Sequence, residues 1–234
     1  SLGALTQDQR GDERNLNIDL RVGEYKLDST HQLRGGGPTR AQGNGNVALP
    51  LGDDGDAIRH ALWYNTDQVF KNAVKRFTQI KTDLAVKVAE EDKSDDFTRE
   101  QAHVFHEPPA VLKFDRDQWA GRLRKISAKA RDFPHIYNSN VTIGTYAGTR
   151  YMVTSEGARL QTAETRYRIT MSAATKAEDG MELSQFSDFN AATPERLPDD
   201  AAIEAAFLAT IKQVMALREA PLAEPYIGPA ILRN

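Results

Sequence analysis

Residues 138–175 read NSNVTIGTYAGTRYMVTSEGARLQTAETRYRITMSAAT, and this stretch decides the fold class. In three parts of it, 138–144, 149–157 and 165–175, β-branched and aromatic residues alternate with polar ones. Alternation with a period of two is typical of strands that have one face on a core. The segments TYAG and SEG carry turn signals. The sequence therefore predicts an antiparallel meander of three strands.

Helical periodicity appears upstream of this stretch. Apolar residues at steps of three and four predict a long helix from Asp56 to about Glu90, with a bend or break near Asn65-Thr66 as an alternative. The predicted buried positions of this helix are Ile58, Leu62, Val69, Phe70, Ala73, Phe77, Ile80, Leu84 and Val88.

Two further helices flank the predicted strands. One is expected over 115–133, capped by Asp115 or Asp117, and the other over 198–221, capped by Asp199 or Asp200. The N-terminal stretch NLNIDLRVGEYKLD (15–28) alternates like a strand pair. Together these elements predict an α+β fold, in which long helices pack on an antiparallel sheet.

The domain organisation follows from the same pattern. We expect one α+β domain over 1–221 and a Pro/Gly-rich connector over 222–234. Within the domain, the Gly-rich stretch 34–46 is predicted to be a surface loop, since no phosphate-binding motif surrounds its glycines. The charged run 90–101 is predicted to be a solvated helix end and linker.

Composition narrows the classes of partner. The chain has 234 residues, a net charge of −3 from 30 basic and 33 acidic residues, and no cysteine. We expect no nucleic-acid partner, because positive charge does not predominate, and we interpret the basic face of the 115–133 helix as solvated. No apolar run is long enough to span a membrane, so no membrane partner is expected. The absence of cysteine leaves the compartment open, because it fits both a reducing cytosol and an exported protein without disulfides.

The residues that could carry chemistry are few. Of the five histidines, His31, His60, His103, His106 and His135, only His103 and His106 lie close together, and Glu107-Pro108-Pro109 follows them. We interpret this pair as ordinary imidazoles in a strand or loop, with Val104 and Phe105 supplying the packing, because a metal site needs more ligands. The carboxylate pairs Asp53-Asp54, Asp95-Asp96 and Asp199-Asp200 are explained by capping and solubility. No catalytic, cofactor-binding or metal residue is predicted in this chain.

Several stretches nevertheless resemble the N-terminal region of the TldD/PmbA family, which is described as a modulator of DNA gyrase and is similar to metallopeptidases. The first is the tail EPYIGPAIL (224–232). The others are LRVGEYKLD (20–28) with PLGDDGDAIRHALWYNTDQVFKNAVKRF (50–77), and the hairpin YMVTSEG (151–157).

The resemblance implies a metal-dependent peptidase that acts on small or unfolded peptides, often as a two-subunit assembly. In the family, a zinc motif of His-Glu, three residues and His follows such a tail, and a cysteine further on is associated with the metal. None of the five histidines has that spacing and the chain has no cysteine, so no catalytic residue is carried over. Zinc is therefore expected in a C-terminal domain and not in this chain.

Two functions remain open. The first is a non-catalytic N-terminal domain of a TldD/PmbA-like peptidase, inactive alone, whose partners in the intact protein are peptides or unfolded proteins and a homo- or hetero-oligomeric subunit. The second is a stand-alone peptide- or protein-binding scaffold without enzymatic activity. The strands at 138–175 are candidates for an edge that pairs with an extended peptide, the alternative being a closed core sheet.

Overall fold

The computed structural model describes residues 2–32, 47–86, 94–221 and 227–231. The chain divides into two compact units: unit 1 comprises residues 1–8 and 102–234, and unit 2 comprises residues 9–101. The sequence predicts one domain over 1–221, and this single domain stays a prediction beside the two compact units. The predicted loop 34–46 lies outside the described residues, and so does most of the predicted connector 222–234.

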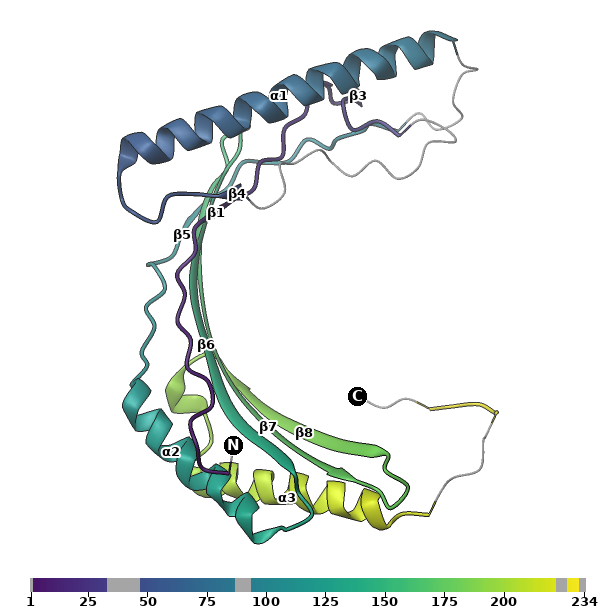
Figure 1. The fold of residues 1–234 in the computed structure, drawn as a ribbon. Coiled ribbons are helices and arrows are strands. Elements are labelled where there is room, and N and C mark those ends of the chain that lie inside the picture. Colours follow the sequence, from purple (N-terminus) through teal and green to yellow (C-terminus); the bar gives the residue numbers. More distant parts are fainter. Residues whose placement is uncertain (1, 33–46, 87–93, 222–226, 232–234) are drawn as a thin grey trace. The chain divides into compact units, whose positions relative to one another are not determined.

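The sheet of unit 1 is built on a long hairpin. Strands β6 (Asn138–Val153), β7 (Arg159–Lys176) and β8 (Glu182–Ala191) are antiparallel, and β7 lies between the other two (Figure 1). A short strand, β5 (Val104–His106), pairs in parallel with the beginning of β7. The predicted α+β class with an antiparallel sheet is confirmed.

The predicted division of the hairpin into strands is partly wrong. Residues 138–144 and 149–153 belong to one strand, β6, because TYAG forms no turn. The Tyr146 side chain occupies the space that a β-carbon on Gly148 would fill, so the glycine is covered within the strand. The SEG segment does turn, with Gly157 at a φ of 101°. Strand β8 was not predicted.

Two helices cover one face of this sheet. Helix α2 (Arg116–Ala128) continues into the 3-10 turn η1 (Lys129–Asp132), and helix α3 (Asp200–Glu219) follows β8 and the 3-10 turn η2 (Pro194–Arg196). Both helices lie on the same side of the sheet (Figure 1). The predicted caps are confirmed: the Asp115 side chain accepts the Gln118 N–H, and the Asp199 side chain accepts the Ala202 N–H.

The core of unit 1 lies between these helices and the sheet. Alternation along β7 directs Ile169 and Met171 toward the helices, and both side chains are fully buried. The other members of this cluster come from β7, α2, β6, α3 and the turns around them: Trp119, Ile126, Ala130, Ile136, Val141, Ala173, Ile203, Phe207, Ile211 and Val214. The opposite sheet face is open, as the exposed Phe186 on β8 shows.

Unit 2 is organised along one helix. Helix α1 (Gly55–Val86) has 32 residues and is about 48 Å long. It continues through Asn65 and Thr66, whose side chains donate to the carbonyls of Ala61 and Leu62, so the predicted alternative of a break is wrong.

The N-terminal strands of unit 2 are shorter than predicted. They are two-residue segments in two pairs, one of β1 (Asn15–Leu16) with β4 (Val47–Ala48) and one of β2 (Gly23–Glu24) with β3 (Leu27–Asp28). The buried stripe of α1 is also narrower than predicted. Among the described residues of this helix only Val69, Ala73 and Ile80 are buried, and Phe70 is 49% exposed. The predicted position Val88 lies outside the described residues.

Candidate functional site

A gap in the strand pairing of β7 forms the candidate site. At its beginning, Arg159–Gln161 pairs with β5, and from Tyr167 onward the same edge pairs with β8. Residues 162–166 lie between these two ladders and pair only with β6, on the opposite edge. The β7 edge is therefore open for a few residues in the middle of the sheet.

The gap arises because the chain after β5 leaves the ladder. The Glu107 N–H still donates to the Gln161 carbonyl (2.9 Å), but Pro108 and Pro109 have no N–H to continue the pairing. The Glu107 carboxylate accepts the Ala163 N–H (2.8 Å) and so substitutes for one backbone partner. The two prolines are the sequence signal that could have located this feature.

The chain returns to β7 at Lys113. Its N–H donates to the Tyr167 hydroxyl oxygen (3.1 Å), and its carbonyl accepts the hydroxyl proton of the same tyrosine (3.0 Å). Residues 107–113 therefore form an arch that is fixed to β7 at both ends.

A pocket of about 270 Å³ lies beneath this arch. This volume is just below the roughly 300–1,000 Å³ of typical small-molecule pockets. Residues of the arch, of β7 and of the turn after β8 line it: Ala110, Val111, Lys113, Ala163, Glu164, Thr165, Tyr167, Ala192, Thr193, Pro194 and Glu195.

The pocket combines charged side chains with an unpaired stretch of backbone. The Arg159 N–H donates to the His103 carbonyl, so the backbone groups of Arg159 point toward β5. Backbone groups of successive residues in a strand point to opposite edges. Thr165 is an even number of positions further on, so its N–H and C=O point to the same edge and face the gap. In the described part of the chain, neither β5 nor β8 pairs with Thr165. The pKa of Glu195 lies below its ordinary value, because its carboxylate accepts hydrogen bonds from its own N–H and the Thr193 hydroxyl and lies near Lys113.

The structure places the two neighbouring histidines at β5. His106 is in β5 and His103 immediately precedes it, and side chains three positions apart along an extended chain point to opposite faces. Val104 and Phe105 are 77% and 51% exposed, so the prediction that they supply packing is wrong. Among the described residues no group of three His, Cys, Asp or Glu could hold a metal ion, so these residues do not fit a zinc site. No helix in the described ranges is long and apolar enough to cross a membrane.

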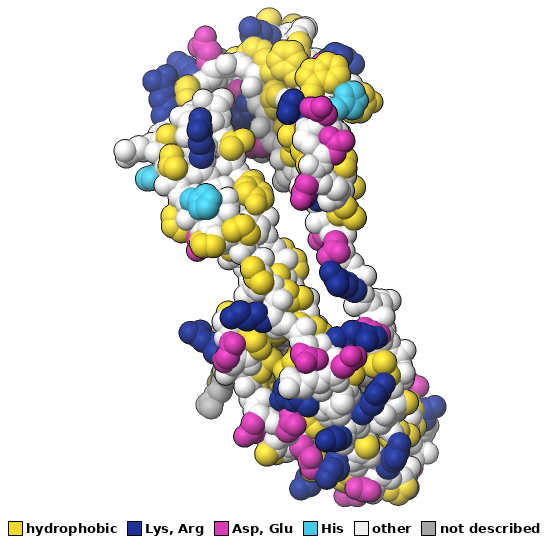
Figure 2. Space-filling view, turned by 90° about the vertical axis from the view of Figure 1, so that its left-hand side faces the viewer, with side chains coloured by type: hydrophobic (Ala, Val, Ile, Leu, Met, Phe, Trp, Pro, Cys, Tyr) yellow, Lys and Arg dark blue, Asp and Glu magenta, His cyan; other side chains and the backbone are white. Residues whose placement is uncertain are grey.

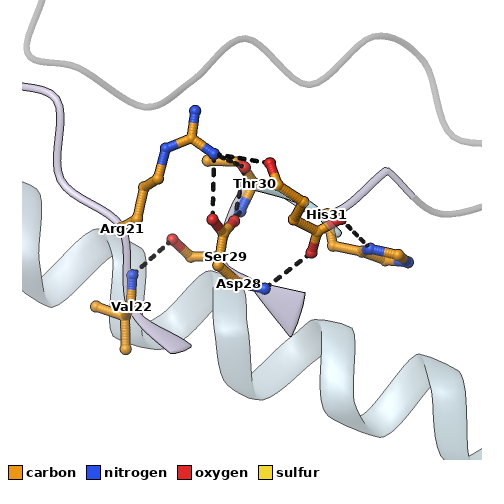
Figure 3. A network of polar contacts seen from close by, with 7 residues as sticks. Arg21, Val22, Asp28, Ser29, Thr30 and His31 are labelled. Atoms are coloured by element: carbon orange, nitrogen blue, oxygen red, sulfur yellow. Dashed lines mark hydrogen bonds and ion pairs between the residues drawn. The ribbon is translucent and has the colours of Figure 1, made fainter. Parts of the chain in front are cut away.

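A polar network in unit 2 was not predicted from the sequence (Figure 3). Arg21 donates to the carboxylate of the buried Asp28 (3.1 Å) and to the Thr30 hydroxyl (2.9 Å). The carboxylate of Asp96 accepts the Asp28 N–H (2.8 Å) and contacts Nδ1 of His31 (2.7 Å). The network joins the β2–β3 hairpin region to a distant segment of the chain.

The described part of the predicted linker, residues 94–101, is therefore more than a solvated connection. The Phe97 ring stacks on Tyr25 with 5.8 Å between centroids, and the Arg21 guanidinium lies 4.5 Å from the Phe97 centroid. The Asp96 side chain is only 13% exposed. The prediction that solubility explains this residue is therefore wrong.

Asp28 gives this network a pH dependence. Burial raises its pKa, but hydrogen bonds from Thr30 and the charge and hydrogen bond of Arg21 outweigh that effect, so the pKa lies below 3.8. The stabilisation is present above pH 3.8 and is lost as pH falls through the lower pKa of the folded state. Asp28→Asn should lower the free energy of unfolding of unit 2 by about 1–3 kcal/mol at neutral pH, and this difference should shrink in acid.

Urea unfolding at neutral pH and below pH 3.8 measures this difference. Asp19→Asn, at an exposed position of the same unit, is the control and should change stability little. An equal effect of both substitutions at neutral pH would contradict the assignment.

Two side chains of the basic face of the 115–133 segment form ion pairs with carboxylates of α3. Arg122 contacts Asp200 (2.5 Å) and Lys129 contacts Glu204 (3.0 Å), both across to α3. Asp200 therefore pairs with α2, while Asp199 alone caps α3. Figure 2 shows basic and acidic side chains interspersed over the face of unit 1 that it draws. This surface fits the expectation of a solvated face, and the absence of a nucleic-acid partner stays a prediction.

Part of the chain matches a protein-family model. Residues 109–213 match the family model described as the PmbA/TldA metallopeptidase central domain. The matched range lies within unit 1 and contains α2, β6, β7 and β8 and all residues that line the pocket. No curated protein and no solved structure matches the chain.

Proposed function

Since the chain belongs to the TldD/PmbA family through residues 109–213, we propose that it supplies a non-catalytic domain of a metal-dependent peptidase. In this proposal unit 1 binds an extended stretch of the substrate peptide, and the zinc ion with its ligands belongs to residues outside this chain. The observation that carries the proposal is the gap in the pairing of β7 with the pocket beside it.

The chemistry of the gap suits a peptide of any sequence. A backbone that enters beside Thr165 can donate to its carbonyl and accept its N–H, which are interactions available to nearly every residue. Recognition through the main chain is what a peptidase for small or unfolded peptides requires, because such substrates share no fixed side-chain pattern.

The charged side chains add a preference for the ends of peptides. Lys113 lines the pocket together with Glu164 and Glu195. An ammonium group and carboxylates in one small pocket match the opposite charges of a peptide C-terminus and N-terminus. Short peptides with a free end at the pocket should therefore bind better than capped ones.

Binding of a fluorescent short peptide, followed by anisotropy, tests the proposed role of the gap. Thr165→Pro removes the N–H that faces the gap and should weaken binding at least about tenfold. Thr165→Val keeps the N–H and removes only the hydroxyl that donates to the Ala192 carbonyl (2.7 Å), so it is the matched control. Equal affinity of the two variants would show that the peptide does not use this backbone position.

The non-catalytic part of the proposal has its own assay. The chain is incubated with zinc and a quenched fluorescent peptide, and no cleavage is expected, because His103 and His106 cannot share a metal ion. Zinc-dependent cleavage that is lost in the His106→Ala variant would overturn this part, whatever the peptide-binding experiment shows.

A further inference from the structure

Two side chains of opposite charge flank Thr165 on the open face of the sheet. Tyr167 is buried on the helix-covered face, and side chains alternate along β7, so Glu164 and Arg166 point to the opposite face. The Arg166 guanidinium lies 5.7 Å from the ring centroid of Tyr146, an exposed residue of β6, which agrees with this direction. A carboxylate and a guanidinium therefore stand on either side of the backbone groups that face the gap.

Neither of these two charges has an ion-pair partner in the described part of the chain. No carboxylate there forms an ion pair with Arg166, and no basic side chain forms one with Glu164. The two residues do not pair with each other either, although they are neighbours on one face of the strand.

The remainder of β7 shows which neighbours the gap removes. Where β8 covers the same edge, the Arg168 guanidinium contacts the Asp188 carboxylate (3.1 Å). Further along this ladder, the Lys176 ammonium contacts the Glu182 carboxylate (3.9 Å). Charged residues of the open face thus find partners of opposite charge on the adjacent strand, and beside Glu164 and Arg166 no such strand is present among the described residues.

We propose that the peptide held in the gap is selected by charge, with an acidic side chain beside Arg166 and a basic one beside Glu164. This rests on the proposed function of the gap and adds a substrate class to it. The preferred sequence is an acidic residue, any residue and a basic residue, in the order from N-terminus to C-terminus.

The order of the charges follows from the direction of pairing. β8 is antiparallel to β7 on the same edge, and the peptide continues that ladder. The central residue of the peptide exchanges both backbone hydrogen bonds with Thr165. In an antiparallel pair its N-terminal neighbour then lies opposite Arg166, and its C-terminal neighbour lies opposite Glu164.

The length of the gap suits three such residues. Residues 162–166 lie between the two ladders, and the Glu107 carboxylate already accepts the Ala163 N–H. The side chain of the central residue points to the helix-covered side, where Thr165 and Tyr167 line the pocket. The side chains of its two neighbours point to the open face, where the two uncompensated charges stand.

The charge pairs grade the affinity and do not replace recognition through the backbone. Opposite charges on adjacent strands stabilise pairing modestly, and like charges destabilise it by similar amounts. Glu164 and Arg166 are exposed, so salt screens both interactions. Peptides of any sequence can still enter, but the order of two charges should change their affinity by about five- to tenfold.

Two fluorescent pentapeptides of equal composition test this order by anisotropy. One is alanine with glutamate at its second and lysine at its fourth position, and the other has these two exchanged. Both carry the same ends, so any contribution of the termini cancels. The glutamate-first peptide should bind about five- to tenfold more tightly at low salt, and the difference should shrink at about 1 M salt.

Charge reversal in the protein tests the assignment to these two residues. The double variant Glu164→Lys with Arg166→Glu keeps the net charge and should prefer the lysine-first peptide by a similar factor. The matched control is Glu178→Lys with Lys212→Glu, two exposed residues of unit 1, and it should keep the original preference.

The outcomes separate this inference from the proposed function. Equal affinity for the two peptides, tighter binding of the lysine-first peptide to the unsubstituted chain, or an unchanged preference in the double variant would each refute the selection by charge. The proposed function would then still stand on the Thr165→Pro experiment. Binding of neither peptide at any concentration would overturn both.

Discussion

Replacement of Phe207 by alanine is expected to lower the free energy of unfolding of unit 1 by about 3–5 kcal/mol. Phe207 lies on α3 with its side chain fully buried, at the contact between that helix and the sheet. Removal of the ring takes away its burial from water and leaves a cavity that the close-packed neighbours fill only in part. Because a domain is stable by only about 5–15 kcal/mol, this is a large fraction of the total.

Urea unfolding followed by tryptophan fluorescence measures this effect. Trp119 is buried in unit 1 and reports on its core, whereas Trp63 of unit 2 is exposed. Phe186→Ala is the matched control, because it removes the same ring from the open face of the sheet, where Phe186 is 67% exposed. It should change stability by no more than about 0.5 kcal/mol. Similar losses in both variants would contradict the described core.

Replacement of Gly23 by alanine is expected to destabilise unit 2 by at least about 2–3 kcal/mol. Gly23 has a φ of 136°, which residues with a β-carbon rarely adopt. An added β-carbon would lie 2.8 Å from Cα of Asp28 and 3.0 Å from the Phe77 ring. The substitution therefore strains the β2–β3 hairpin and displaces the aspartate on which the polar network depends.

Far-ultraviolet circular dichroism during thermal unfolding follows unit 2 through its long helix α1. Gly52→Ala in the same unit is the control, since nothing lies within 4 Å of its added β-carbon. The Gly23→Ala variant should unfold at a clearly lower temperature, and Gly52→Ala should not. A neutral Gly23→Ala variant would show that the hairpin does not hold the described conformation.

The sequence identified those elements whose signals, such as a cap or a turn glycine, lie within a few residues of the element itself. Asp115 and Asp199 were recognised as caps because capping is an interaction of a side chain with backbone two or three residues away. Gly157 was recognised at its turn for the same reason. The TYAG segment was misread because a glycine in a strand looks like a turn until the ring that covers it, Tyr146, is placed in space.

The sequence by itself determined the α+β class, the three long helices, the hairpin turn and the resemblance to the TldD/PmbA family. Only the tertiary structure decided the division into two units, the gap beside Thr165 and the network of Asp28 with His31 and Asp96. The physical reason is the distance along the chain over which each feature forms. A cap or a turn is local, whereas the gap depends on which strands reach β7, and the network joins residues 65 or more positions apart.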